Sequence, residues 1–177
     1  DAAAQTVDHR LGPASLVVAA AGVLMPGYIT SLPRKQWEAE IATNAVGLMH
    51  TVSAFVPQLM HTAKAGVADL VAVSSIGATG GPVPLAAVYT ASKAFVENLM
   101  RTVREELDPY GIRACCVAPG LVSTELHPAE TRAMLADASA LAPADIANSI
   151  VHVAALPSHV GVPSMSVVPT GQPLIPQ

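Results

Sequence analysis

The residues of this sequence best suited to chemistry are a tyrosine and a lysine in the stretch YTASK, Tyr89 to Lys93. Residues four apart share one face of a helix, so the two side chains would lie close together if the stretch is helical. An ammonium group beside a phenol favours the phenolate and would lower the pKa of Tyr89, making it a usable general acid or base near neutral pH. The spacing alone fits an ordinary pair on a helix surface equally well, so the surrounding elements have to decide between these interpretations.

Other reactive side chains form weaker patterns. The six histidines have no close metal-ligand spacing, which predicts that there is no metal site. Ser75 lacks the G-x-S-x-G elbow that is typical of a hydrolase nucleophile. Cys115 and Cys116 are adjacent in an apolar run, which favours core packing over redox chemistry and gives no reason to expect an oxidising compartment.

The composition narrows the setting further. The chain has 177 residues, of which 51% are hydrophobic, and this is enough for one core and therefore for a single domain over residues 1–177. A net charge of -4, with 12% charged residues and no basic run, argues against a nucleic-acid or membrane partner and favours a small molecule. The longest apolar runs are shorter than the roughly 18 residues of a spanning helix, and we expect a cytoplasmic protein.

Apolar runs and helical periodicity alternate along the chain. Strands are expected at residues 14–22, 69–75, 112–119 and 164–170, and helices at 34–64, 85–107 and 143–156. The first run is typical of a strand buried on both faces, and Pro57 is expected to bend the first of these helices. The alternation predicts an α/β fold with a doubly wound parallel sheet.

In such a sheet, ligands bind outside the carboxyl ends of the strands. Gly22, Ser75 and Pro119 with Gly120 lie at three of these ends. Ser75 ends its strand and Tyr89 begins the following helix, so the intervening loop can place a hydroxyl and a phenol around one carbonyl group. The sequence therefore predicts a site for carbonyl chemistry at this edge of the sheet.

Taken in order, Ser75, YTASK and APGLVST resemble the short-chain dehydrogenase/reductase family, as do VVAAAGV, ATNAVG and VSSIGATGG. The resemblance runs from about Leu16 to the end of the chain and implies a catalytic tetrad of Asn44, Ser75, Tyr89 and Lys93. Tyr89 would protonate the carbonyl oxygen and Ser75 would hydrogen-bond it. Lys93 would tune Tyr89 and hold the nicotinamide ribose, while Asn44 would act through water bound where its helix is locally distorted.

The resemblance also implies a nicotinamide dinucleotide as cofactor. Residues flanking it would be Ala20, Ala21 and Gly22 on the adenosine side and Pro119, Gly120, Val122 and Thr124 on the nicotinamide side. The closing stretch ALPSHVGVPSMSVVPTGQP resembles the NADP-dependent 3-hydroxy acid dehydrogenase branch, which favours NADP and leaves NAD possible.

Two departures from the family pattern stand out. AAAG replaces the usual Asn-Asn-Ala-Gly, and no glycine-rich turn for the pyrophosphate is present. The sequence begins DAAAQTVDHR, without a starting Met and within a helical pattern. We therefore expect the C-terminal portion of a Rossmann-like fold that lacks the first strands, with the strand from Leu16 to Ala20 as an exposed apolar edge.

Two functions remain open at this point. The first is an oxidoreductase that moves hydride between the cofactor and a carbonyl or secondary alcohol of a small or moderately hydrophobic substrate. The second is a non-catalytic fragment or interaction protein that keeps the tetrad and cannot hold a dinucleotide. The pocket would be lined by residues 76–88 and covered by a lid over 123–141. By resemblance, the helices at 34–64 and 85–107 would pair in a homodimer or homotetramer, whereas internal packing would explain their apolar stripes as well.

Overall fold

The computed structural model describes residues 2–126 and 140–172 and contains one parallel sheet flanked by helices. The sheet order is β1-β2-β3-β4, formed by β1 (Leu16–Ala19), β2 (Ala68–Val73), β3 (Ile112–Pro119) and β4 (Ser164–Val167). The α-helices are α1 (Ala2–Leu11), α2 (Arg34–Ile41), α3 (Gly47–Ala63), α4 (Ala87–Leu107) and α6 (Pro143–Ala154). The predicted α/β parallel fold is confirmed, and no helix of the described ranges is long and apolar enough to cross a bilayer.

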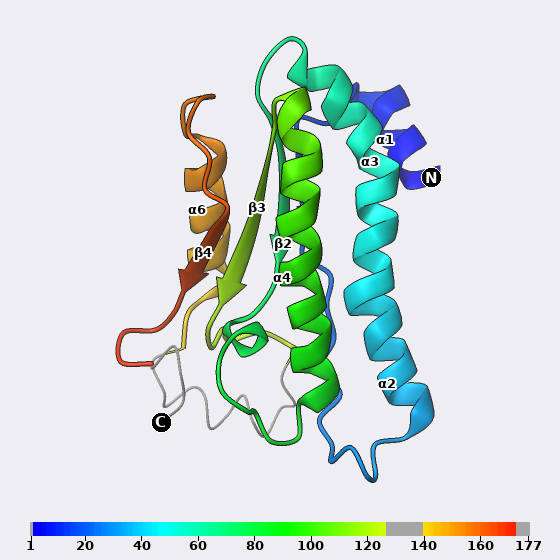
Figure 1. Cartoon of the computed structure of the whole chain (residues 1–177), viewed down its shortest axis with the longest axis vertical. Helices are drawn as coiled ribbons and strands as arrows, with labels where there is room; N and C mark the ends of the chain where they lie inside the picture. Colours follow the sequence, from blue (N-terminus) through cyan, green and yellow to red (C-terminus); the bar gives the residue numbers. More distant parts are fainter. Residues whose placement is uncertain (1, 127–139, 173–177) are drawn as a thin grey trace.

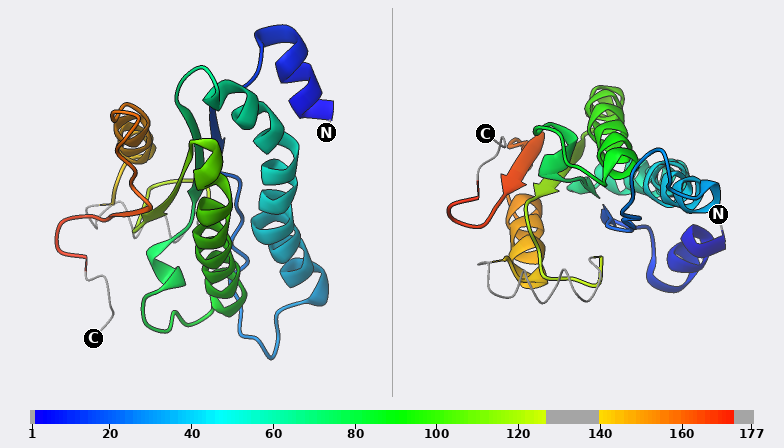
Figure 2. Two further views of the ribbon diagram at one scale, coloured as in Figure 1. Left: turned by 45° about the horizontal axis from the view of Figure 1, so that its top comes forward. Right: turned by 90° about the horizontal axis from the view of Figure 1, so that it is seen from below.

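The helices lie on both faces of the sheet (Figures 1 and 2). α3 and α4 cover one face, and α6 covers the other face near β3 and β4. Side chains of β2 alternate between these layers, since Leu70 and Ala72 pack under α3 and α4 while Val71 packs against α6. This alternation follows from the period of two in a strand and explains why β2 is apolar throughout.

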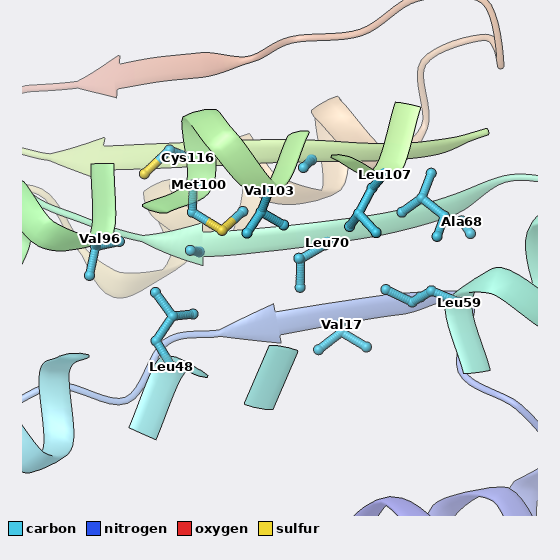
Figure 3. Packing of buried hydrophobic residues seen from close by; sticks show 13 residues of the cluster. Val17, Leu48, Leu59, Ala68, Leu70, Val96, Met100, Val103, Leu107 and Cys116 are labelled. Carbon is cyan, nitrogen blue, oxygen red and sulfur yellow. The ribbon is translucent and has the colours of Figure 1, made fainter. Parts of the chain in front are cut away.

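The larger core lies between β2, β3 and the pair α3 and α4 (Figure 3). Leu59 and Leu70 are fully buried at its centre, and Val96, Met100 and Val103 come from one face of α4. The spacing of three and four residues between these α4 side chains is that of an amphipathic helix. Packing of this stripe fixes the rotation of α4, and with it the direction in which Tyr89 and Lys93 point.

β1 departs from the sequence prediction of a strand buried on both faces. Val17 is buried under α3, but Leu16 and Val18 on the opposite face are 39% and 40% exposed. The reason is that α6 covers the sheet at β3 and β4 and does not reach β1. β1 is also an edge strand of the described sheet, as expected.

The long helix predicted at 34–64 is interrupted. A π-helical turn, η1 (Ala42–Val46), separates α2 from α3, and Asn44 lies at its centre. Pro57, where we expected the bend, lies inside α3, and the helix is continuous through it. π turns are frequent at functional sites, and this one contains Asn44, a predicted site residue.

A buried ion pair joins the far end of the sheet to α6. Arg113 of β3 donates to both carboxylate oxygens of Asp69 on β2, at 2.7 and 2.8 Å, from a directly facing register position. The same guanidinium donates to four main-chain carbonyls at and after the end of α6, those of Ala154, Leu156, Pro157 and Val160. One side chain therefore anchors the segment that leads from α6 to β4.

Candidate active site

Two adjoining pockets open at the carboxyl ends of the strands, and every predicted site residue lines one of them. The larger has a volume of about 1130 Å³ and the smaller about 370 Å³. The larger is lined by Ala20, Gly22, Ser75, Tyr89, Lys93, Pro119, Gly120, Val122 and Thr124. Asn44 and Ala21 line the smaller pocket, which shares Ala20 and Lys93 with the larger one. Residues up to about 100 positions apart in the sequence thus meet as the strand-end argument expects.

Tyr89 and Lys93 lie on the pocket face of α4. The Lys93 ammonium is 5.8 Å from the centre of the Tyr89 ring and donates a hydrogen bond of 2.9 Å to the carbonyl of Val73 at the end of β2. A Cβ at Gly22 would lie 3.2 Å from the Lys93 Nζ. The close approach of the chain to this amine explains why glycine follows the first strand.

The direction of the Tyr89 pKa corrects the sequence prediction. Burial raises the pKa of Tyr89, the charge of Glu40 raises it further, and a hydrogen bond with Ser75 lowers it. Burial also lowers the pKa of Lys93 by disfavouring its charged form. The expected lowering of the Tyr89 pKa is therefore wrong here, because desolvation of the buried phenol is the largest effect on it.

Ser75 is held in a defined hydrogen-bonding state. It caps the short 3-10 helix η2 (Ile76–Ala78), and its Oγ accepts the N–H of Gly77 at 3.1 Å. The hydroxyl proton is not used in this bond, so Ser75 can donate it to the Tyr89 oxygen or to another acceptor in the pocket. The residue can thus donate to a carbonyl oxygen beside Tyr89.

Asn44 uses its side chain within the protein. Its Nδ2 donates to the carbonyl of Val23 at 2.9 Å and to the Ser92 hydroxyl at 3.0 Å, and its Oδ1 accepts the Val23 N–H at 2.8 Å. Ser92 in turn donates to the carbonyl of Tyr89 at 2.7 Å. The predicted local distortion is present as η1, but both amide hydrogens are engaged, so Asn44 links the first strand's exit to the start of α4. The role through water stays a prediction.

Glu40 is a further buried residue near the site, and it was not among the residues predicted from the sequence. This carboxyl lies one helical turn before Asn44, is fully buried, and accepts the Met25 N–H at 3.1 Å. Burial raises its pKa. An acidic residue four positions before Asn44, on the same helix face, was the available signal.

The other side of the larger pocket is formed by the segment after β3. Leu121 donates its N–H to Oε1 of Gln172 at 3.0 Å, and a Cβ on Gly120 would collide with that Gln172 side chain. Thr124 accepts the N–H of Leu126 at 3.3 Å. Of the predicted lid, residues 127–139 lie outside the described residues.

The loop between β2 and α4 also lines the pocket. Its Leu85 has a left-handed backbone, with φ of 66°, and its carbonyl accepts the Gly27 N–H at 2.8 Å. A non-glycine residue in this region is strained and needs support from its surroundings. This hydrogen bond joins the β2–α4 loop to the segment that follows β1. Within the described ranges, no group of three or more His, Cys, Asp or Glu gathers as a metal site.

Comparison with known proteins gives the chain a family. A family model described as short chain dehydrogenase matches residues 1–135. Sulfoacetaldehyde reductase 2 of Chromohalobacter salexigens is 34% identical over 167 residues, which cover 89% of this chain and 64% of that protein. The glycine betaine reductase ATRR of Emericella nidulans is 31% identical over 173 residues, or 94% of this chain and 13% of that protein.

A solved structure agrees with these relatives. The NADPH-bound short chain oxidoreductase from Pseudomonas aeruginosa PAO1, described as containing an atypical catalytic center, superposes with a TM-score of 0.80 at 26% identity. The superposition covers 94% of this chain and 69% of that one. This chain therefore spans less than two thirds of the two matched relatives' sequences and about two thirds of the matched structure.

Proposed function

This chain belongs to the short-chain dehydrogenase/reductase family, and we propose that the protein transfers a hydride between a nicotinamide cofactor and a carbonyl or secondary alcohol. The observation that carries the proposal is the convergence of Ser75, Tyr89 and Lys93 on one cavity at the carboxyl ends of the strands. The matched relatives are named as reductases, and nothing in the comparisons supports the non-catalytic alternative.

The proposed cofactor is NADP, in line with the NADPH-bound relative. The larger cavity suits its nicotinamide half, because Gly22, Lys93 and Gly120 all line it and the chain at Gly22 approaches the Lys93 amine closely. Lys93 and Tyr89 would hold the ribose. Pro119, Gly120, Val122 and Thr124 would flank the nicotinamide, and Ala20, Ala21 and Gly22 the adenosine side. When bound, the cofactor supplies or accepts the hydride.

The protein's own part in reduction is to hold and move protons. Tyr89 would protonate the carbonyl oxygen, and its raised pKa keeps the phenol protonated at neutral pH, as reduction requires. Ser75 would donate its free hydroxyl proton to the same oxygen, which stabilises the charge that develops there. Lys93 would orient the ribose, and Asn44 would act through water besides positioning Val23 and Ser92.

The cavity lining indicates the substrate class. Its walls carry large apolar side chains, including Leu24, Met25, Val83, Leu121 and Ile146. Lys93 is the one basic side chain among the described lining residues, and the proposed cofactor role occupies it. We therefore propose a small or moderately hydrophobic, uncharged carbonyl compound, in contrast to the sulfonate substrate in the relative's name.

Two further features belong to the proposal. Val46 and Met49, near the start of α3, and Phe95 on α4 are 40 to 49% exposed, and a homodimer or homotetramer through these helices would cover them. Cys115 and Cys116 are free and buried, which suits the reducing cytoplasm.

The test is NADPH consumption followed at 340 nm with small and larger ketones, with NADH as the comparison. We expect turnover with hydrophobic ketones and preference for NADPH. Failure of the purified protein to bind either dinucleotide in calorimetry would favour the non-catalytic alternative. Light scattering on the same sample reports the oligomeric state.

A further inference from the structure

Glu40 and Asn44 both form hydrogen bonds with the backbone of the segment that follows β1. Glu40 Oε1 accepts the Met25 N–H at 3.1 Å, and Asn44 both donates to and accepts from the backbone of Val23, at 2.9 and 2.8 Å. Four residues of helix rise about 6 Å, and two residues of extended chain advance about 6.6 Å. The two side chains on one helix face therefore match alternate residues of the segment.

Burying the Glu40 carboxyl group costs free energy of desolvation. The residue is fully buried, and within the described structure its Oε2 has no hydrogen-bond partner. An apolar side chain would fill the same space without the cost of desolvating a carboxyl group. Within the described structure, the hydrogen bond that Glu40 makes is the one that it accepts from the Met25 N–H, and no described cation pairs with its carboxyl group.

The segment held by these bonds, residues 23–25, forms part of the wall of the proposed active site. Val23, Leu24 and Met25 line the larger cavity together with Tyr89. Two residues further on, the Gly27 N–H is tied to the strained Leu85 of the opposite loop. The wall is therefore fixed at both ends, by the helix side chains and by the loop.

We propose that Glu40 is a positioning residue for substrate selection. It holds Met25 in place in the wall of the larger cavity, so that the cavity admits substrates of limited size. The effect on substrate selection rests on the proposed reductase function. The hydrogen bond between Glu40 and Met25, called the clamp below, is a property of the fold alone. Glu40 lines neither of the two pockets, so it would act on the substrate through the backbone of Met25.

Two substitutions separate the acceptor from the volume of the side chain. Glu40→Gln keeps an oxygen acceptor for Met25, and Glu40→Met has a similar length and no such acceptor. The matched control is Glu38→Met on the same helix, where the carboxylate is exposed and pairs with Arg34. All three variants remove one carboxyl group from α2.

We expect Glu40→Met to change the ratio of kcat/KM between bulky and small ketones by roughly tenfold, chiefly through KM, because one buried backbone donor loses its partner. Glu40→Gln and Glu38→Met should stay within about twofold of the wild type. NADPH affinity should be unchanged in all three. A general loss of stability would lower the rates with every ketone alike and leave this ratio unchanged.

Amide hydrogen exchange tests the clamp without any activity. The Met25 amide should be protected in the wild type and in Glu40→Gln, and should exchange roughly tenfold faster in Glu40→Met. If the wild type reduces no carbonyl, the proposed function fails. Exchange at the Met25 amide still shows whether Glu40 holds this backbone group. Wild-type exchange and selectivity in Glu40→Met would overturn the proposal, as would a Glu40→Gln that behaves like Glu40→Met. An unprotected Met25 amide in the wild type would do so even if a variant did not fold.

Discussion

Replacing Gly22 by alanine tests how closely the chain must approach the proposed catalytic lysine. The added Cβ would lie 3.2 Å from Lys93 Nζ and 3.5 Å from Asn44 Oδ1. The first distance is shorter than an ordinary contact, so the amine has to move by a few tenths of an ångström. The amine is not free to do so, because it is tied to the Val73 carbonyl at 2.9 Å.

The size of the effect follows from that bond. Weakening a hydrogen bond from a charged donor costs about 1.5–3 kcal/mol, which corresponds to roughly 10- to 150-fold in kcat/KM. The same displacement should weaken NADPH binding, since Lys93 is proposed to hold the ribose. Global stability should fall by no more than the value of this one bond, because Gly22 does not have a left-handed backbone and the added Cβ meets side-chain atoms and no backbone.

The assay compares Gly22→Ala with Gly66→Ala, where a Cβ would meet nothing within 4 Å. Steady-state NADPH oxidation gives kcat/KM, calorimetry gives cofactor affinity, and thermal unfolding checks the fold. Rates and affinities of Gly22→Ala equal to those of Gly66→Ala would refute the argument that the chain packs against a functional amine.

Three further predictions concern the buried ion pair, the Tyr89 phenol and a buried cysteine. Arg113→Met should lower the free energy of unfolding in urea by about 3–5 kcal/mol, because Asp69 is left buried without its partner, and Asp69→Asn combined with Arg113→Met should lose less than the sum of the single changes. Reduction should stay constant through neutral pH and fall only at alkaline pH, because the protonated phenol is the acid and burial raises the pKa of Tyr89; a fall centred near pH 7 to 8 would contradict this. Cys115, whose pKa burial raises to about 11, should react with a thiol reagent no faster than the protein unfolds, and rapid labelling of the native protein would show that the strand is open.

The arrangement of the site was predictable because it depends on chain order. Parallel strands bring their carboxyl ends to one edge, so Gly22, Ser75 and Pro119 meet whatever the details of packing. The helical spacing of Tyr89 and Lys93 likewise follows from local periodicity. These parts of the fold need only the alternation of strands and helices.

The remaining features depend on burial, which the sequence does not give directly. The pKa of Tyr89 is set by how deeply α4 places the phenol, and spacing to a lysine says nothing about desolvation. The exposed face of β1 depends on the reach of α6. The π turn at Asn44 and the buried Glu40 form one arrangement, since their bonds to Val23 and Met25 are long-range contacts that no local pattern reports.

The central claim is that Tyr89 delivers the proton to a carbonyl group beside a nicotinamide. Tyr89→Phe removes the hydroxyl group and keeps the aromatic ring at this position of α4. We predict that single-turnover oxidation of bound NADPH by a ketone slows by roughly 10²- to 10⁴-fold in this variant, while NADPH affinity stays within about threefold of the wild type. A Tyr89→Phe protein that oxidises NADPH at the wild-type rate would contradict the account.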